Sequence, residues 1–166
     1  MGQINTREIV LLASQVITTS GTGPDINAIQ AWQAAMISIN GNTISGTLPT
    51  FDFYIQKKLG QAATTDLVGN PPTGTAIYDD VLHFTQITTN TTRISAICTG
   101  PLGISTVSTQ PTITTGADWA QSDAALGAGV LRIGPLGGIW RVKYVITGTT
   151  PQGTFSVTTQ LIPFST

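Results

Sequence analysis

Side chains that could carry chemistry are scarce in this sequence. Asp, Glu, Lys and Arg make up 9% of its 166 residues, and it has a single histidine, His83, and a single cysteine, Cys98. His83 lies in an extended run beside Phe84, and Asp80, three positions away, falls off its strand face. No Gly-x-Ser-x-Gly nucleophile motif is present. We therefore expect no Ser-His-Asp site and assign His83 to a partly buried or surface position on a strand.

The carboxylates offer no better pair for acid–base chemistry. A glycosidase needs two of them at one substrate, one in an apolar pocket. Glu8 is the only glutamate, and Asp52 alternates with two phenylalanines, so it should point away from the core. Asp79 and Asp80 are adjacent and would lie on opposite faces of a strand. We interpret these residues as solvated, and we expect no catalytic residue and no enzyme activity.

Metal, cofactor and nucleic-acid sites also lack their motifs. No His/Cys spacing suits zinc, and no P-loop or dinucleotide fingerprint occurs. Asp25 with Asn27, and Asp79 with Asp80, could give oxygen ligands to calcium in loops, but at too low a density for a dedicated site. The net charge is -1 and basic residues form no patch. We expect no metal, no cofactor and no nucleic-acid partner.

The apolar runs and the lone cysteine exclude other classes. Thr, Gly and Pro cut the apolar runs well below the roughly 20 residues of a spanning helix, so we expect no membrane association. Arg7 and Glu8 before the short apolar run 9–13 do not resemble a signal peptide. Cys98 cannot form an intrachain disulfide, and its strand-like surroundings predict a small buried residue.

The sheet is organised around a stretch near the end of the chain. Residues 139–147 and 154–161 alternate between apolar and polar side chains, which is typical of half-buried strands. Between them, the run Gly148-Thr149-Thr150-Pro151-Gln152-Gly153 has the composition of a turn. This pattern predicts a β-hairpin.

The same design occurs earlier in the chain. Residues 35–39 lead into Gly46-Thr47-Leu48-Pro49, which is followed by the alternating run 50–56. Both copies have a strand, then Gly-Thr-x-Pro, then a strand whose first aromatic residue is Phe51 or Phe155. We infer one sheet-building unit that is used twice.

The remaining pattern predicts a single all-β domain. An arm, residues 1–7, precedes a domain at 8–166 with long loops at 61–75 and 100–129. Turn signals recur about every ten residues, and Asn40-Gly41-Asn42 is one of them by composition. We expect seven to nine short strands and at most one short helix, at 117–129. The fold class is an antiparallel β-sandwich, jelly-roll-like, with an immunoglobulin-like Greek key as the alternative.

The low charge suits a surface that partners cover, while a sparsely charged sandwich that works alone is the alternative reading. A polar arm that becomes ordered on binding is one candidate contact. A Trp in a sandwich lies in the core or at a subunit interface, or it stacks on a sugar. The candidate interface residues are Gln3, Ile4, Asn5, Trp32, Trp119 and Trp140.

Three segments, 45–53, 83–88 and 141–157, resemble small β-rich structural proteins of tailed bacteriophage virions. They match a Ser-Gly-Thr-x-Pro-Thr element, a His-Phe-Thr-Gln strand, and an Arg-Val-x-Tyr strand with a Gly-Thr-x-Pro turn and a Phe-x-Val strand. The resemblance covers roughly residues 35–160, and the segment 102–129 departs from it.

The resemblance implies a capsid decoration (cement) protein, or a minor head or tail component, without enzyme activity. Such a protein would be made in the host cytoplasm and located on the capsid surface of the virion. Its partners would be the major capsid protein and its own copies, which we expect to form a homotrimer. The alternative function is a module of a tail or fibre that binds host glycans.

Overall fold

The computed structural model describes residues 7–28, 34–61, 75–98, 106–108, 114–117, 127–128, 130–132 and 138–162, with side chains at 7–27, 34–59, 75–92, 127–128 and 138–162. This described part is built from strands and contains no helix. The strands are β1 (Arg7–Ile17), β2 (Gly21–Thr22), β3 (Ile26–Ala28), β4 (Ala34–Gln61), β5 (Ala76–His83), β6 (Thr91–Cys98), β7 (Thr106–Ser108), β8 (Thr114–Ala117), β9 (Val130–Arg132) and β10 (Gly138–Ile162).

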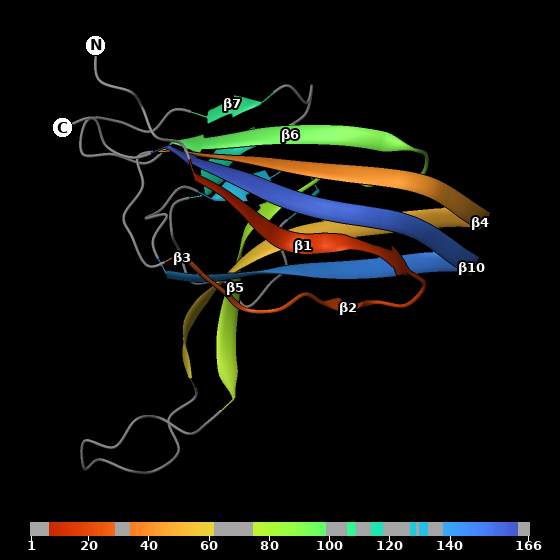
Figure 1. The fold of residues 1–166 in the computed structure, drawn as a ribbon, viewed down its shortest axis with the longest axis horizontal. Coiled ribbons are helices and arrows are strands. Elements are labelled where there is room, and N and C mark those ends of the chain that lie inside the picture. The colour runs from red at the N-terminus through yellow and green to blue at the C-terminus, as the bar shows by residue number, and fades with distance from the viewer. Residues whose placement is uncertain are drawn as a thin grey trace.

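Two of these strands are far longer than the sequence pattern predicted. β4 has 28 residues and β10 has 25. Each runs to one end of the molecule, turns and comes back, so each has a first and a second arm (Figure 1). The first arm of β4 pairs with the second arm of β10, from Ala34↔Ile162 to Ser45↔Gln152. The second arm of β4 pairs with the first arm of β10, from Thr50↔Thr147 to Lys57↔Trp140.

These two pairings give two layers. In the first layer, β1 pairs with the second arm of β10, and β6 and then β7 follow the first arm of β4. In the second layer, β2 and β3 pair with the first arm of β10, and β5, β9 and β8 follow the second arm of β4. All pairings are antiparallel except that of β8 with β9. The all-β antiparallel fold is thus confirmed, whereas its type, jelly roll or Greek key, stays a prediction.

The prediction of a hairpin at 139–161 is wrong. The arms of β10 do not pair with each other; each pairs with an arm of β4, the earlier copy of the same design. The reason is the apolar side of each arm. Val142 on one arm and Phe155 and Val157 on the other are fully buried, so the arms face each other across the core instead of lying edge to edge.

The core lies between the two layers. The ring of Phe155 has its centroid 4.7 Å from those of both Phe51 and Phe53, which come from the opposite layer. Trp140 is also part of this core and is 1% exposed. Its Nε1 has no hydrogen-bond partner among the described residues, so the indole contributes apolar volume. Ala35, Ile37 and Ile39, all fully buried, complete the inner side of the first layer.

The turn expected at Asn40-Gly41-Asn42 is wrong. β4 continues through these residues, which pair with Ser156, Phe155 and Thr154. A Cβ on Gly41 would lie 2.5 Å from Cε1 of Phe155. The glycine therefore makes room for a core ring and does not mark a turn.

Other expectations fall partly outside the described residues. β7 and β8 lie within the segment 100–129 that was expected to be a loop. Ala117, the start of the expected helix, is the last residue of β8, and 118–126 lie outside the described residues, as do 62–74 of the other expected loop.

The corners of β4 and β10 interlock. Gly46 and Gly148 have φ of 117° and 119°, a region that disfavours any residue with a Cβ. A Cβ on Gly46 would lie 2.8 Å from the carbonyl oxygen of Thr150, and one on Gly148 would lie 2.8 Å from that of Leu48. The backbone of the other Gly-Thr-x-Pro segment thus occupies the space where each glycine would otherwise carry a side chain.

We predict that Gly46→Ala and Gly148→Ala each lower the free energy of unfolding by about 1–3 kcal/mol from the unfavourable φ alone, with the steric clash adding to it. Urea denaturation measures this change. Gly21→Ala is the control, because its nearest neighbour is the movable Tyr144 ring at 3.1 Å. Both clashes arise where the two corners touch, so once one substitution has pushed the corners apart the second should cost less. The double variant should therefore lose less unfolding free energy than the sum of the two single losses; additive losses would contradict the interlock.

Candidate functional site

The two outer surfaces of the layers differ in chemistry. Side chains that point outward from β4, β5 and the first arm of β10 in the second layer form what we call the charged face: Thr50, Asp52, Tyr54, Gln56, Lys58, Tyr78, Asp80, His83, Arg141, Lys143, Val145 and Thr147. Those from β1, the first arm of β4 and the second arm of β10 in the first layer form the neutral face: Glu8, Val10, Val16, Met36, Ser38, Asn40, Asn42, Thr154, Ser156, Thr158 and Gln160.

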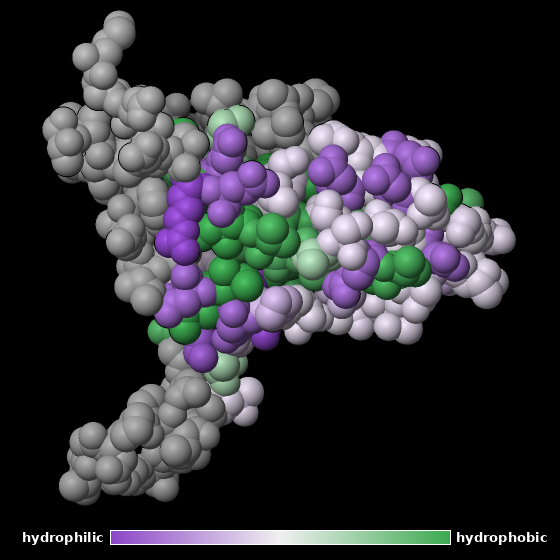
Figure 2. Space-filling view, in the orientation of Figure 1, coloured by the Kyte–Doolittle hydropathy of each residue, from purple (hydrophilic) through white to green (hydrophobic). Residues whose placement is uncertain are grey.

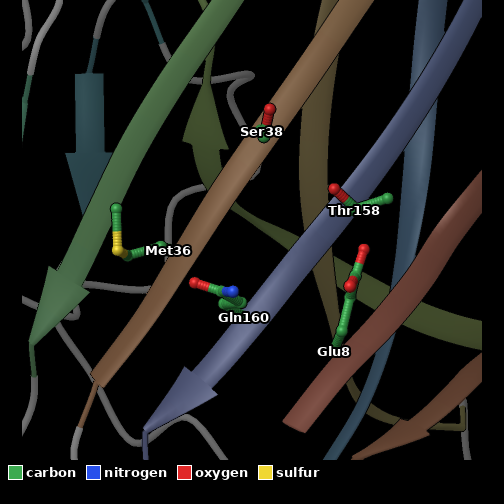
Figure 3. Close-up of a pocket in the computed structure, with 5 residues that line it drawn as sticks. All are labelled: Glu8, Met36, Ser38, Thr158 and Gln160. Carbon is green, nitrogen blue, oxygen red and sulfur yellow. The ribbon is translucent and has the colours of Figure 1, made fainter. Parts of the chain in front are cut away.

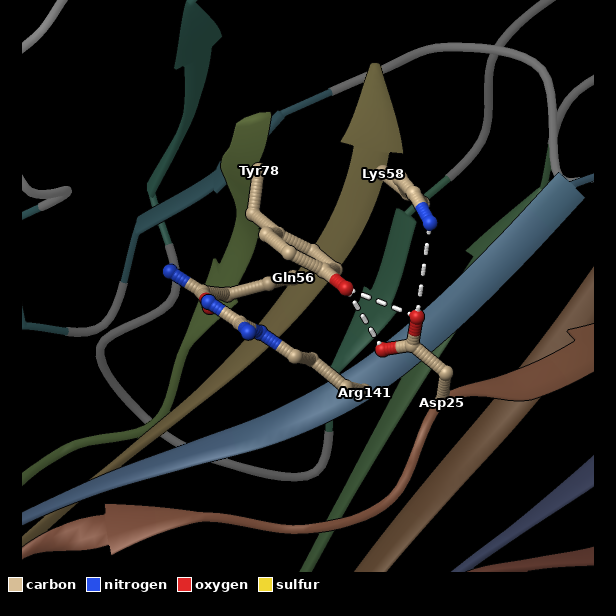
Figure 4. Close-up of polar contacts among 5 residues, drawn as sticks. All are labelled: Asp25, Gln56, Lys58, Tyr78 and Arg141. Atoms are coloured by element: carbon tan, nitrogen blue, oxygen red, sulfur yellow. Dashed lines mark hydrogen bonds and ion pairs between the residues drawn. The ribbon is translucent and has the colours of Figure 1, made fainter. Parts of the chain in front are cut away.

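On the charged face, Tyr78 connects β5 to the edge of its layer. Its ring reaches across β4, and its hydroxyl points to Asp25, which precedes β3 (Figure 4). The hydroxyl donates to the carboxylate of Asp25, 2.7 Å from each oxygen, and Lys58 Nζ lies 3.7 Å from Oδ2. This cluster ties the segment between β2 and β3 to the middle of the second layer.

A second cluster surrounds Gln56. Its Nε2 donates to Asp80 Oδ1 at 2.8 Å, and its Oε1 accepts a hydrogen bond from Arg141 Nε at 2.8 Å. The guanidinium carbon of Arg141 lies 3.3 Å from the centre of the Tyr78 ring, a cation–π contact (Figure 4). Gln56 and Asp80 are each 6% exposed, so these polar groups are buried with hydrogen bonds made. The expectation that Asp79 and Asp80 are solvated is therefore wrong, since Asp79 is only 7% exposed.

The third cluster joins Asp52 to His83. Asp52 points away from the core, as predicted, and its Oδ1 lies 3.3 Å from His83 Nε2. Gln86 donates to the other oxygen at 3.2 Å. The Tyr54 ring stacks on the imidazole, with centroids 3.9 Å apart, and Lys143 Nζ lies 5.0 Å from the centre of the tyrosine ring. Because His83 is 5% exposed, we interpret the cluster as a cross-strand lock and not as a base open to substrate.

The sequence did not predict this pair. Asp52 and His83 are 31 positions apart, and only the register Tyr54↔His83 between β4 and β5 brings them together. The alternation within each strand indicates on which side of that strand each residue lies. It gives no signal that the two strands are neighbours. The expectation that Asp80 falls off the strand face of His83 is also wrong, because the register shift between Ile55 and Gln56 places both on the charged face.

Burial and charge shift three pKa values in this region. The pKa of Tyr78 is raised, first by burial and then by its hydrogen bond to Asp25. The pKa of Tyr54 is raised by burial and by the negative charges of Asp52 and Asp80. Burial lowers the pKa of Lys57, which lies opposite Asp79 in the register.

The neutral face has the opposite character. Apart from Glu8 it consists of Ser, Thr, Asn, Gln, Val and Met side chains. Three of its apolar side chains are well exposed: Val10 at 50%, Val16 at 57% and Met36 at 38%. Figure 2 shows parts of both layers; toward the tip, on the right, the described surface is mostly pale, the colour of weakly polar residues.

The residues expected at an interface are only partly described. Trp140 lies in the core, so its ring is already covered within the chain. Gln3, Ile4, Asn5, Trp32 and Trp119 lie outside the described residues. Cys98 ends strand β6, as expected, but its side chain is outside the described part.

Neither a metal site nor a sugar platform is formed by the side chains just described. Within the described ranges, no group of three or more His, Cys, Asp or Glu is placed to hold a metal ion. Arg141 covers one face of the Tyr78 ring, and Tyr54, stacked on His83 with Lys143 nearby, is only 8% exposed.

Among the described residues, the structure has no helix of the length and apolarity needed to cross a bilayer.

We predict that stability falls as the pH rises above about 10, the ordinary tyrosine value. A pKa that is raised on folding stabilises the protein below the unfolded value, and this stabilisation is lost as pH rises through the folded value. Tyr78→Phe should lower the free energy of unfolding by about 1 kcal/mol at neutral pH and reduce the alkaline loss. Urea titrations at neutral and alkaline pH test both effects. The lowered pKa of Lys57 acts in the opposite direction and is common to both proteins.

An unchanged alkaline profile in Tyr78→Phe, or an unchanged stability at neutral pH, would contradict the role given to the Tyr78–Asp25 contact. Tyr54→Phe provides a second variant, because its shift has the same direction without a hydrogen bond to Asp25.

Comparison with protein-family models, with curated proteins and with solved structures finds no match for this chain.

Proposed function

We propose that this chain is a structural subunit of a tailed-phage virion, a capsid decoration protein that binds the shell through its neutral face. The observation that carries the proposal is the contrast between the two faces. Glu8 is the one charged residue of the neutral face as defined above, whereas the charged face holds most of the other charged side chains of the described part.

The chemistry of the neutral face suits a permanent contact. Burying a charge requires a partner for it, whereas Ser, Thr, Asn and Gln side chains can exchange water for hydrogen bonds across an interface at lower cost. Exposed Val10, Val16 and Met36 add apolar area that gains free energy when water is removed. The face is formed by long paired strands, so little backbone order has to be gained on docking.

The chemistry of the charged face suits a surface that points toward solvent. Asp25, Asp52 and Asp80 already have partners inside the face, so an incoming protein would have to displace existing hydrogen bonds. Surface charge also keeps a protein soluble when its other side is covered. We therefore place the neutral face on the major capsid protein and the charged face outward.

Contacts between copies are a further part of the proposal, with a homotrimer as the expected assembly. Leu48 supports it: this side chain is 84% exposed at the tip of the molecule, with a positive φ of 49°. An apolar side chain held outward at a conformational cost is well placed for insertion into a neighbour.

We predict that native mass measurement gives a trimer for the unchanged chain and smaller species for Leu48→Ser. A change at Val145, a half-buried apolar residue of the charged face, to Ser is the control and should leave the assembly unchanged. A monomer in the unchanged chain would remove the homotrimer from the proposal, and a trimer that persists in Leu48→Ser would remove the role of this side chain.

For capsid binding, we predict that Ser156→Arg, on the neutral face but outside the surroundings of Glu8, weakens binding at least about tenfold, because the docked surface would bury an unpaired charge. The assay mixes the purified chain with capsids that lack it and measures the co-pelleted fraction over a range of concentrations.

Val145→Arg is the matched control, since both side chains are half-buried and point outward from β10, one on each face. Equal weakening by both variants, or loss of binding in Val145→Arg alone, would contradict docking through the neutral face. Failure of the unchanged chain to pellet would contradict the decoration function itself.

A further inference from the structure

The neutral face contains a hollow of about 210 Å³ around its one charge. Glu8 comes from β1, Met36 and Ser38 from β4, and Thr158 and Gln160 from β10 (Figure 3). These three strands are neighbours, and Gln160 in the middle strand is the register partner of both Glu8 and Met36. The five side chains therefore line one hollow because they project from the same side of the first layer.

The lining combines one anion with a flexible apolar wall. Glu8 makes no ion pair or hydrogen bond with any described residue, and the described side chains that form the neutral face include no cation. The Met36 side chain is 38% exposed and adapts easily to a guest. Ser38, Thr158 and Gln160 add oxygen atoms that can accept hydrogen bonds.

Docking would change the state of Glu8. In the free chain, water solvates this exposed carboxylate. Under a docked surface the water is removed, and a carboxylate without a counter-charge would then oppose binding. A partner that covers this face must therefore bring a positive charge to Glu8.

We propose that the hollow receives a lysine side chain of the partner protein that the neutral face binds. This inference rests on the proposed function and names the chemistry of the partner at this point. The stem of a lysine is unbranched and apolar and can lie against Met36 and the Thr158 methyl group. Its ammonium group has three donors in no fixed plane, which suits one carboxylate with scattered hydroxyl and amide oxygens; the planar fork of arginine suits a paired, flat acceptor.

The isolated full chain allows a direct test, because it contains two methionines, Met1 and Met36. Labelling the methionine methyl groups with ¹³C gives two signals, and Met36→Leu identifies the one from the hollow. The probe is N-acetyl-lysine N-methylamide, and N-acetyl-norleucine N-methylamide is its neutral match of similar shape.

We expect the lysine probe to shift the Met36 signal in a saturable way and the norleucine probe to leave it nearly unchanged. Glu8→Gln, which keeps the shape of the side chain, should weaken the lysine probe about fivefold, the effect of a partly exposed ion pair. Asp25→Asn is the control, because it removes a carboxylate from the opposite face. No shift with lysine, equal shifts with both probes, or equal affinity in Glu8→Gln would overturn the inference.

Capsid pelleting separates this inference from the function on which it rests. Glu8→Gln should weaken capsid binding and reduce its dependence on salt. If Ser156→Arg abolishes capsid binding but Glu8→Gln leaves its affinity and salt dependence unchanged, the docking face stands and the lysine contact is overturned. If the lysine probe binds but Ser156→Arg still pellets with capsids, the docking face is wrong, and with it the partner assigned to the hollow.

Discussion

The mutual contact of two Gly-Thr-x-Pro corners holds this fold together. At each corner a glycine with a strongly positive φ lets a long strand cross from one layer to the other, and the backbone of the second corner fills the space that a side chain would need. Thr50 and Thr147 join their hydroxyl groups beside the corners, and Thr43 and Thr154 do so at 2.8 Å on the other side. The position of every other described strand follows from this central pair, because β4 and β10 are the partners on which both layers are built.

The corners also explain how one chain presents two unlike faces. Each long strand carries one side-chain pattern before its corner and another after it. In β4 the outward residues change from Met36 and Ser38 in one arm to Asp52 and Gln56 in the other, while both arms keep an apolar inner side. The strand pairing fixes which arms lie together, so neutral side chains gather on one layer and charged ones on the other. The proposed docking surface thus arises from the same crossing that forms the core.

Much of this architecture was predictable from local pattern. Alternation identified the arms of β10 and the second arm of β4, the repeated Gly-Thr-x-Pro showed that the two regions share a design, and Asp52 was correctly placed on an outward side. Local pattern could not show that the two copies pair with each other, because the same alternation serves a hairpin and a crossing strand. Gly41 illustrates the limit: its composition indicates a turn, and only the Phe155 ring packed against it shows why a glycine lies inside a strand.

The functional clusters were less accessible to sequence reasoning than the fold. Tyr78 with Asp25, and Asp52 with His83, are separated by 53 and 31 positions, and each pair depends on strand neighbours that no motif announces. The hollow around Glu8 likewise draws on three strands from both ends of the chain. Each of these sites depends on the register in which its strands pair. That register depends on contacts between distant residues, which the alternation within a single strand does not reveal.

The pairing of β4 with β10 has a consequence for how the chain is made. Thr147 is made 97 positions after Thr50, so neither layer has its central pair until β10 has been synthesised. Folds dominated by such distant contacts form slowly, and before β10 emerges from the ribosome the arms of β4 can pair with β5 and β6 along one edge only. During that interval they are open to strands of other nascent chains, which makes the speed of translation and the presence of chaperones determinants of yield.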